Sequence, residues 1–512
     1  MNAFEQLLGR RALQDHGARI ALEFGEQAVT YAELGALATR AARAWKALGA
    51  QPGDRVVIMM RDSPAFAAAW LGALHCGAVA VAVSTKLTEA EFRHVRRDSE
   101  ARVVLVEDTF AQARPDLTAE FAAEGALAVA GEAQGARSWD AGLAEGENSA
   151  PFPANLDDPA FWLYSSGTTG MPKGIIHTHR SVLPVGQAQR EIVGLVPGDK
   201  VIATSKLFFA YALEHGLLGP LATGATSVLD PDWPDAERVL RSVARHRPTA
   251  FFSVPTMYQR LLALGGDRLE PFRAVRGFVA AGERLPGELV RRWQAATGGE
   301  ILSLYGMSET FCAAIVTPRG SSTGPRTGLP LRGVDVRLAT VDGRAVTDGE
   351  PGVLWVRHPG LALGYVHRPE QTAAQFRDGW FCTKDMFVRD AEGFYCHQGR
   401  ADELLKISGQ WIRPGELEEA VAGAEGVLEA ACVPVPDAEG LDRLALFITA
   451  QGDPAVALAA AASRCEERLP RHKRPRWLRA VADLPRTATG KVQRFRLREL
   501  LERELAEAPH GS

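Results

Sequence analysis

Short apolar runs alternate with helical periodicity in the first quarter of the chain. Val56–Met59 is rich in β-branched residues and predicts a strand. Ser63 follows as a helix cap with a proline directly after it, and Gly77 stands where that helix would end. Val79–Val83 predicts the next strand. This order of elements is typical of an α/β fold with a largely parallel sheet.

The same alternation returns further along the chain. Arg102–Val106, Phe251–Val254 and Gly277–Ala281 each predict a strand. Residues 111–155 are rich in Ala, Gly and Glu with weak periodicity, which predicts peripheral helices and loops. A large mixed α/β body with parallel-rich sheets is therefore expected up to about residue 400.

The pattern changes beyond that point. Pro414–Ala422 is helix-like and Glu429–Val435 is strand-like, as in a small α+β unit. The 512 residues also exceed the roughly 250–300 at which one hydrophobic core stops growing. We therefore expect an N-terminal domain at 1–401 and a small, mobile C-terminal domain at 402–512, with the hinge near Asp402.

Composition and charge exclude several classes of protein. The formal net charge is −4, from 58 Lys and Arg against 62 Asp and Glu, so there is no overall basic field to recruit nucleic acid or an anionic membrane. The start of the chain lacks the pattern of a signal peptide, and no stretch approaches the ~20 apolar residues of a membrane span. The cysteines are scattered without metal-site spacing, which predicts reduced thiols and a cytoplasmic location. They are Cys76, Cys312, Cys382, Cys396, Cys432 and Cys465.

The segment Tyr164–Gly174, YSSGTTGMPKG, concentrates hydroxyls, glycines and Lys173 directly after a strand-like run. Such a loop can wrap a phosphate chain with backbone N–H groups and side-chain donors. It is not the G-x-x-x-x-G-K-S/T loop, and a flexible linker would not need the ordered T-T-G-x-P-K-G arrangement. The segment resembles the phosphate loop of the adenylate-forming superfamily, which includes acyl-CoA synthetases, adenylation domains and luciferases. The nucleotide ligands implied here are Ser165, Ser166, Gly167, Thr168, Thr169 and Lys173.

Further segments match the same superfamily in the expected order. Leu304–Thr310, LYGMSET, resembles the Y-G-x-S/T-E motif. The resemblance implies that Tyr305 borders the adenine and acid pockets, that Ser308 meets the α-phosphate, and that Glu309 helps to hold Mg²⁺. The chemistry agrees, because a hard cation prefers carboxylate and phosphate oxygens.

Thr383-Lys384-Asp385 stands where the family has T-G-D. By resemblance, Asp385 accepts hydrogen bonds from the ribose hydroxyls, and Arg400 is a second ribose or phosphate ligand. Lys384 departs from the family because a glycine tolerates a positive φ that lysine disfavours. The geometry of this turn is left open by the sequence.

Lys406–Pro414, KISGQWIRP, resembles the loop that approaches the active site for thioester formation, in particular in the benzoate-CoA ligase branch. The implied coenzyme A (CoA) contacts are Ser408 and Gly409. Lys406 and Trp411 complete the loop, although Trp411 is equally suited to ordinary packing. The predicted cofactor-binding residues of this loop are Lys406, Ser408, Gly409 and Trp411.

Near the end of the chain, Pro485–Val492, PRTATGKV, resembles the P-x-T-x-S/T-G-K motif. The resemblance makes Lys491 the mobile catalytic lysine, which neutralises charge on the carboxylate and the α-phosphate. Lys173 and Glu309 complete the predicted catalytic set.

The acid pocket is predicted from an aromatic segment that resembles the benzoate-CoA ligases, Lys206–Tyr211, KLFFAY. Phe208 and Phe209 are equally compatible with a structural core. Glu214 and His215 replace small residues, which points to a substituted ring, although Glu214 is also compatible with a surface position. The predicted pocket residues are Phe209, Tyr211, His215, Ala280, Ala281, Gly282, Tyr305, Gly306 and Cys312.

These resemblances imply an enzyme that uses ATP and Mg²⁺ to convert a small aromatic carboxylic acid to an acyl-adenylate, and then CoA to make the thioester. The same thiol chemistry would serve transfer to a carrier protein instead of CoA. A nucleotide sensor would keep the ATP loop but would not need Lys491. The basic run Arg471–Arg474 could meet the CoA phosphate or be a solvated face.

Overall fold

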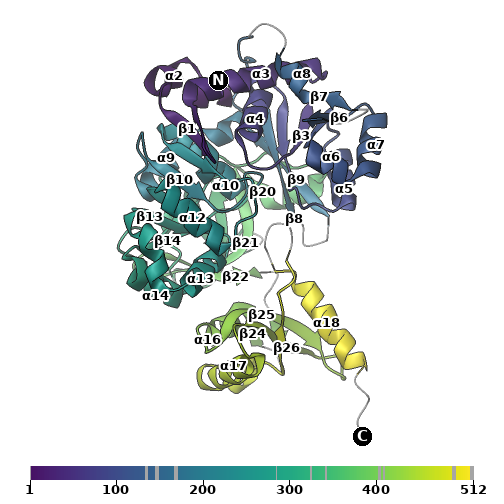
Figure 1. Cartoon of the computed structure of the whole chain (residues 1–512). Helices are drawn as coiled ribbons and strands as arrows, with labels where there is room; N and C mark the ends of the chain where they lie inside the picture. The colour runs from purple at the N-terminus through teal and green to yellow at the C-terminus, as the bar shows by residue number, and fades with distance from the viewer. Residues whose placement is uncertain are drawn as a thin grey trace.

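The computed structural model describes residues 2–132, 136–144, 149–166, 171–283, 285–322, 326–340, 343–401, 405–407, 410–486 and 492–507. A large mixed α/β body precedes a small C-terminal domain, which lies to one side of it (Figure 1). This arrangement confirms the predicted fold class. No helix in the described part of the chain has the length and apolar character needed to cross a bilayer.

The first sheet of the body is mainly parallel and ends in an antiparallel pair at β8 and β9. Its strands, in spatial order, are β19 (Gly364–Tyr365), β9 (Pro172–Thr178), β8 (Pro159–Ser166), β4 (Val79–Ala82), β3 (Arg55–Met59), β5 (Val103–Glu107), β6 (Leu127–Ala130) and β7 (Arg137–Ser138). The strand predictions at β3, β4 and β5 are confirmed. Strands β6 and β7 were not predicted, because weak periodicity hid two short strands at the edge of the sheet.

The second sheet carries a parallel run from β10 to β14. Its strands, in spatial order, are β16 (Leu329–Pro330), β15 (Ile315–Val316), β14 (Ile301–Tyr305), β13 (Gly277–Ala280), β12 (Ala250–Ser253), β10 (Lys200–Ala203), β11 (Thr226–Leu229), β1 (Ile20–Phe24) and β2 (Gln27–Thr30). Ligands of open parallel sheets bind outside the carboxyl ends of the strands. The predicted pocket segments at Ala281 and Tyr305 lie at those ends.

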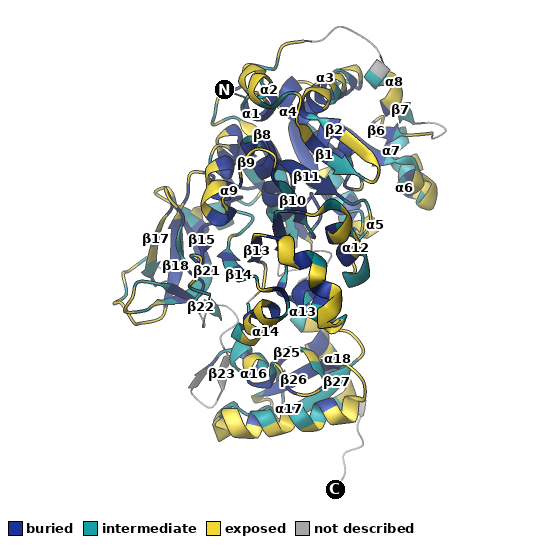
Figure 2. Cartoon of the chain, turned by 60° about the vertical axis from the view of Figure 1, so that its left-hand side comes forward, coloured by how far each residue is buried: buried dark blue, intermediate teal, exposed yellow. Residues whose placement is uncertain are grey.

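Helices pack on both faces of the two sheets. They are α1 (Ala3–Leu8), α2 (Arg10–His16), α3 (Tyr31–Ala47), α4 (Pro64–Cys76), α5 (Glu89–Asp98), α6 (Asp108–Ala113), α7 (Pro115–Ala123), α8 (Trp139–Ala144), α9 (Val185–Val193), α10 (Ala210–Leu213), the π-helix η2 (Glu214–Leu218), α11 (Gly219–Thr223), α12 (Ala236–His246), α13 (Pro255–Ala263), α14 (Gly287–Thr297) and α15 (Pro369–Gln375). Buried residues follow the strands, and exposed residues follow the outer sides of the helices (Figure 2). Helix α4 ends as predicted, with Ser63 accepting from Phe66 N–H and Gly77 at φ 82°.

A third, antiparallel sheet closes the body towards the small domain. Its strands are β17 (Asp335–Ala339), β18 (Gly352–Arg357), β21 (Trp380–Arg389), β20 (Phe376–Arg377) and β22 (Tyr395–Arg400). Strand β22 pairs with β21, so that Asp385 lies opposite Arg400.

The small domain packs helices on an antiparallel and parallel sheet, as an α+β unit. Its elements are the ribbon β23 (Leu405–Ile407) and β24 (Gln410–Ile412), the strands β25 (Val427–Pro436), β26 (Asp442–Ala450) and β27 (Trp477–Val481), and the helices α16 (Pro414–Val421), α17 (Pro454–Arg468) and α18 (Arg494–Glu507). The predicted helix and strand after residue 413 are confirmed at α16 and β25. The predicted hinge, Asp402, lies outside the described residues.

Candidate active site

The predicted phosphate loop joins β8 to β9, which pair as an antiparallel hairpin with Ser165 opposite Lys173. Hairpin pairing therefore places Lys173 close to the loop. Gly167, Thr168 and Thr169 lie outside the described residues, as does the side chain of Ser166. Their part in nucleotide binding stays a prediction.

Lys173 forms an ion pair with Glu309, with 3.2 Å between Nζ and Oε1. The same carboxylate oxygen accepts a hydrogen bond of 2.7 Å from the Tyr365 hydroxyl, and Lys173 Nζ lies 3.9 Å from the centre of the Tyr365 ring. Tyr365 belongs to β19, which pairs with β9, and the sequence did not predict it as a site residue. Three segments distant in sequence thus meet around one carboxylate.

The charges of this cluster are set by burial and by the ion pair. Burial raises the pKa of Glu309, but Lys173 and the Tyr365 hydroxyl outweigh it and the pKa lies below its usual value. Burial lowers the pKa of Lys173, which Glu309 opposes. Glu309 is therefore anionic at neutral pH, and carboxylate oxygens are ligands that Mg²⁺ prefers. No group of three or more metal-ligating side chains occurs in the described ranges.

On the other side of the site, the Tyr305 hydroxyl donates to Asp385 Oδ2 at 2.6 Å. Arg400 Nη1 lies 3.6 Å from Asp385 Oδ1, and His397 Nε2 lies 3.8 Å from the same oxygen. Burial raises the pKa of Asp385, but His397, Arg400 and Tyr305 bring it below its usual value. The sequence motifs did not include His397, which reaches the carboxylate through the pairing of β21 and β22.

Lys384 adopts φ 62°, the left-handed conformation that glycine takes without strain. The turn that the sequence left open thus has a positive φ at Lys384. Thr383 Oγ1 accepts from Asp385 N–H at 3.0 Å and donates to the Leu354 carbonyl at 2.8 Å, which holds Asp385 in place.

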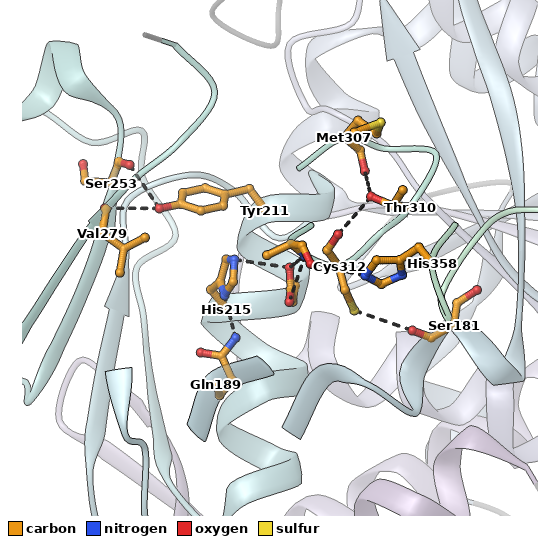
Figure 3. A network of polar contacts seen from close by, with 12 residues as sticks. Ser181, Gln189, Tyr211, His215, Ser253, Val279, Met307, Thr310, Cys312 and His358 are labelled. Atoms are coloured by element: carbon orange, nitrogen blue, oxygen red, sulfur yellow. Dashed lines mark hydrogen bonds and ion pairs between the residues drawn. The ribbon is translucent and has the colours of Figure 1, made fainter. Parts of the chain in front are cut away.

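Tyr211 extends from α10 across the ends of β12 and β13. Its hydroxyl lies 3.1 Å from the Ser253 carbonyl and 3.3 Å from the Val279 carbonyl, both of which can accept its proton (Figure 3). The ring of Tyr211 shares one hydrophobic cluster with Ala281 and Tyr305. These three predicted pocket residues are thus brought together.

Other predicted pocket residues lie elsewhere. The side chain of Ala280 packs on the opposite face of the sheet from that of Ala281, because successive strand residues alternate. Phe209 packs against the core cluster around α3 and α4, as expected if it is a residue of the structural core and not of the pocket. Gly282 has φ 85°, and a side chain at Gly306 would come within 3.3 Å of Ala313 Cα. Glycine leaves room there for a ligand or a close backbone.

Glu214 and His215 begin the π-helix η2 and are buried, with relative exposures of 1% and 0%. The surface alternative for Glu214 is therefore wrong. Glu214 Oε2 accepts from Ala313 N–H at 3.2 Å and lies 3.2 Å from His215 Nε2. The His215 ring stacks on Phe252 and meets the Tyr211 ring edge to face, with 4.9 Å between the ring centres.

This polar pair is neutral. Burial raises the pKa of Glu214 to about 8, although the Ala313 N–H opposes it, and burial lowers the pKa of His215 to about 3. The side-chain amide nitrogen of Gln189 forms a hydrogen bond with His215 Nδ1. The Gln189 Oε1 and His215 Nε2 atoms are buried without a hydrogen bond of good geometry. Buried polar atoms of this kind have spare capacity for a polar ligand group.

Cys312 lies behind this pair and is fully buried. Its Sγ contacts the Ser181 carbonyl at 3.7 Å, and burial together with Glu214 raises the pKa of the thiol (Figure 3). All six cysteines are buried. Phe311, directly before Cys312, adopts φ 60°, an uncommon conformation for a bulky residue.

The predicted CoA contacts Ser408 and Gly409 lie outside the described part of the chain, as do the side chains of Lys406 and Trp411. The predicted catalytic lysine of adenylation, Lys491, also lies outside it. Within the basic run, Lys473 pairs with Glu416 and Arg474 donates to carbonyls of its own domain. Only part of that run is thus available to a CoA phosphate.

Comparisons with known proteins agree with this geometry. The model of the AMP-binding enzyme family matches residues 9–366, and the model of the AMP-binding enzyme C-terminal domain matches residues 416–491. A 3-hydroxybenzoate–CoA ligase of Aromatoleum sp. (strain CIB) is 41% identical, with 98% of this chain and 97% of the relative covered. A benzoate–CoA ligase of Thauera aromatica is 37% identical, with 97% and 95% covered. The crystal structure of an anthranilate CoA ligase with anthranoyl-AMP superposes with a TM-score of 0.91 at 31% identity, with 99% and 98% covered.

The AMP-binding enzyme model extends over Lys173, Tyr305 and Glu309, and the two curated relatives match 98% and 97% of the chain. The order of the motifs and the match along the whole length exclude a chance likeness of one loop. The chain belongs to the AMP-binding enzyme family of adenylate-forming enzymes, in its benzoate-CoA ligase branch.

Proposed function

We propose that this enzyme activates a hydroxylated benzoate. It is an AMP-forming acid–thiol ligase, for which ATP, Mg²⁺ and CoA are the cosubstrates and an aromatic acid is the substrate. The hydroxyl group is the finer part of the proposal. The observation that carries it is the buried, neutral pair Glu214 and His215 directly behind the Tyr211 ring.

A polar pair in an apolar wall favours a substrate that can hydrogen-bond to it. A site built to bond a substrate hydroxyl rejects the analogue without it, because the buried polar groups are then left unpaired. His215 Nε2 has no well-formed hydrogen bond, and Glu214 is bonded to Ala313, on which Gly306 packs. The relative named for 3-hydroxybenzoate supports the same substrate class.

In the first half-reaction, the substrate carboxylate attacks the α-phosphorus of ATP and pyrophosphate leaves. We assign Lys173 and Glu309 to the phosphates and their cation, and Asp385 with Arg400 to the ribose. Mg²⁺ neutralises phosphate charge when bound. The chain's own contribution is to hold these groups in place before the reaction and to exclude water. Lys491 is proposed to neutralise charge on the reacting oxygens from the small domain.

In the second half-reaction, the CoA thiol attacks the acyl carbonyl and AMP leaves. We propose that the domain 402–512 rotates about Asp402 and presents Ser408 and Gly409 to the pantetheine arm. Asp402→Pro should then slow thioester formation more than adenylation. Equal losses in both half-reactions would reject this hinge. A carrier protein as acceptor remains the alternative, and a direct assay of CoA against a phosphopantetheinylated carrier separates the two.

The test of the substrate is a pyrophosphate-release assay with benzoate, the three hydroxybenzoates, anthranilate, phenylacetate and aliphatic acids, each with and without CoA. We expect one hydroxybenzoate to exceed benzoate in kcat/KM by at least about tenfold, the scale of one good hydrogen bond. His215→Phe should reduce that preference, while Glu191→Gln on the exposed side of α9 should not. Benzoate turned over as well as every hydroxybenzoate would overturn the hydroxyl assignment and leave the ligase activity standing.

A further inference from the structure

His177 connects two motifs of the nucleotide side, although the sequence did not predict it as a site residue. It lies on β9, the strand that carries Lys173. Side chains alternate along a strand, so Lys173, Ile175 and His177 share one face of β9. The first of them pairs with Glu309 and the last reaches Ser308. One strand face therefore meets two consecutive residues of the turn after β14.

The contact between His177 and Ser308 is a hydrogen bond of 2.7 Å between Nε2 of the ring and the backbone carbonyl. A carbonyl oxygen can only accept, so Nε2 carries the proton and donates it. His177 is 0% exposed, so bulk water does not compete for this bond. Phe311 N–H donates to the same carbonyl at a longer distance, 3.3 Å. His177 is thus the closer of two donors that hold the carbonyl directly before Glu309.

The imidazole ring of His177 is itself held on two sides. Ser181 Oγ lies 3.2 Å from Nδ1, the ring nitrogen that does not contact Ser308. The same hydroxyl accepts from Thr178 N–H at 3.4 Å, which leaves its own proton for Nδ1. The ring of Phe161 stacks on His177, with 4.9 Å between the ring centres and 12° between the planes. The donor therefore points at the carbonyl before any nucleotide binds.

The turn that accepts this bond has an uncommon backbone. Phe311 adopts φ 60°, and a bulky residue keeps such a conformation only where the surrounding structure over-determines it. The Glu309 carbonyl accepts from Ala362 N–H at 2.8 Å, so a second segment also holds the turn. The backbone of Ser308 and Glu309 is thus fixed by donors from outside the turn, and His177 supplies one of them.

We propose that His177 is a positioning residue for adenylation. Its Nε2–H fixes the backbone at Ser308 and thereby the place of the Glu309 carboxylate that follows. The inference rests on the nucleotide-binding roles proposed for these two residues, and it adds the group that sets their position. A misplacement of about 1 Å lowers a rate by about 10²-fold, so a hydrogen bond to the backbone beside the reacting groups has a clear kinetic effect.

Two substitutions separate this hydrogen bond from the packing of the ring. His177→Phe keeps an aromatic ring against Phe161 but removes the donor. His177→Gln loses the ring but keeps an N–H donor at the same covalent distance from Cβ as Nε2. A positioning role predicts that His177→Phe is the more impaired of the two variants, whereas a role in packing alone predicts the reverse order.

The rate of adenylation is measured as pyrophosphate release with an aromatic acid and no CoA. We expect His177→Phe to lower kcat/KM for ATP by about 10- to 100-fold and to leave the KM for the acid within about twofold. His177→Gln should stay within about threefold of the wild-type enzyme. Calorimetric titration with ATP and Mg²⁺, without acid, should show weaker binding by His177→Phe and not by His177→Gln. His179→Gln is the control, because it changes another buried histidine, which accepts from Ala3 N–H, and it should alter none of these values.

Ser181→Ala tests the same bond with the ring of His177 retained, and it decides the matter if the melting temperature shows that His177→Phe does not fold. It should lower kcat/KM for ATP by about 2- to 10-fold, because the ring loses the contact that orients it. Unchanged kinetics in this variant, or a more active His177→Phe than His177→Gln, would overturn the positioning role. Wild-type adenylation by Glu309→Gln would instead overturn the proposed nucleotide-binding role of the turn.

Discussion

The carboxylates on the two sides of the site have opposite charge states. Glu309, on the nucleotide side, has a pKa below its usual value, whereas the pKa of Glu214, on the acid side, is raised to about 8. Both side chains are shielded, at 13% and 2% exposed. Glu309 has the ammonium of Lys173 at 3.2 Å, while Glu214 has the neutral imidazole of His215 at the same distance.

The comparison shows that burial does not decide the charge of a carboxylate. The cation partner decides it, since burial alone disfavours the ionised form. The nucleotide side needs negative oxygen for a metal-bound phosphate chain. A fixed negative charge at Glu214 would instead repel the substrate carboxylate, so neutrality suits the acid side.

The largest expected effect comes from removing the charge on the nucleotide side. Glu309→Gln keeps the shape of the side chain but deletes the anion that pairs with Lys173 and that we propose as the Mg²⁺ ligand. We expect adenylation to fall by about 10²- to 10³-fold, as for the loss of one preorganised electrostatic contact. Pyrophosphate release without CoA measures it. Glu237→Gln, at a surface pair with Arg268, is the matched control, and similar losses in both variants would remove the contrast between the two sides.

A smaller effect is expected at the proposed ribose ligand. Asp385→Asn replaces an acceptor of charge-assisted hydrogen bonds by an amide, which costs about 1.5–3 kcal/mol, or about tenfold to hundredfold in affinity. The KM for ATP should rise by that factor and the KM for the acid should not. Because Tyr305 donates to Asp385, an equal rise in both KM values would show that the aspartate acts by holding Tyr305 in the acid pocket.

The sequence predicted the parts of this contrast that depend on local pattern. Strands β3, β4 and β12 are short apolar runs. The ordered motifs contain Lys173 and Glu309, which form an ion pair in the structure. They also contain Asp385 and Arg400, which lie close to each other. The three motifs lie on or directly after β9, β14 and β21, which belong to three different sheets, so it is the packing of these sheets that brings the motifs together.

Residues that reach the site through strand pairing could not be predicted in this way. Tyr365 contacts Glu309 because β19 pairs with β9, and His397 approaches Asp385 because β22 pairs with β21. Neither pairing leaves a local signal. The opposite orientations of Ala280 and Ala281 could have been predicted from the sequence. Side chains alternate along a strand, so the two residues could not both face the pocket.

On the acid side, the neutral state of Glu214 predicts how stability depends on pH. The folded protein keeps a proton on Glu214 up to a pKa of about 8, while the unfolded chain releases it above 4.5, so this group destabilises the fold as pH rises between those values. His215 acts in reverse, because its pKa falls from 6.5 to about 3, and it favours the fold as pH rises from 3 to 6.5. The two effects oppose each other between pH 4.5 and pH 6.5, and the destabilising effect of Glu214 acts alone above pH 6.5.

Glu214→Gln removes that cost. Relative to the wild-type protein, the variant should gain on the order of 1–2 kcal/mol in free energy of unfolding between pH 6.5 and pH 8. Urea denaturation at the two pH values measures the change. Glu300→Gln is the control, since the pKa of Glu300 is lowered and its charge is constant over this range. If the difference in free energy of unfolding between Glu214→Gln and the wild-type protein is the same at both pH values, Glu214 is already ionised at pH 6.5. The carboxylates on the two sides of the site would then have the same charge.

The smallest effect is expected beside Asp385, where Lys384 occupies the left-handed region at φ 62°. Lys384→Gly relieves about 1–2 kcal/mol of backbone strain but adds about 0.5–1 kcal/mol of entropy cost on folding. The net gain in stability should lie between about 0 and 1.5 kcal/mol, and the KM for ATP should not change, since Thr383 still bonds Asp385 N–H. Lys384→Val, with a branched side chain at the same φ, should be destabilised and should raise the KM for ATP. Equal melting temperatures for the glycine and valine variants would show that the backbone at residue 384 is not strained. The position of Asp385 on the nucleotide side would then not depend on a strained turn.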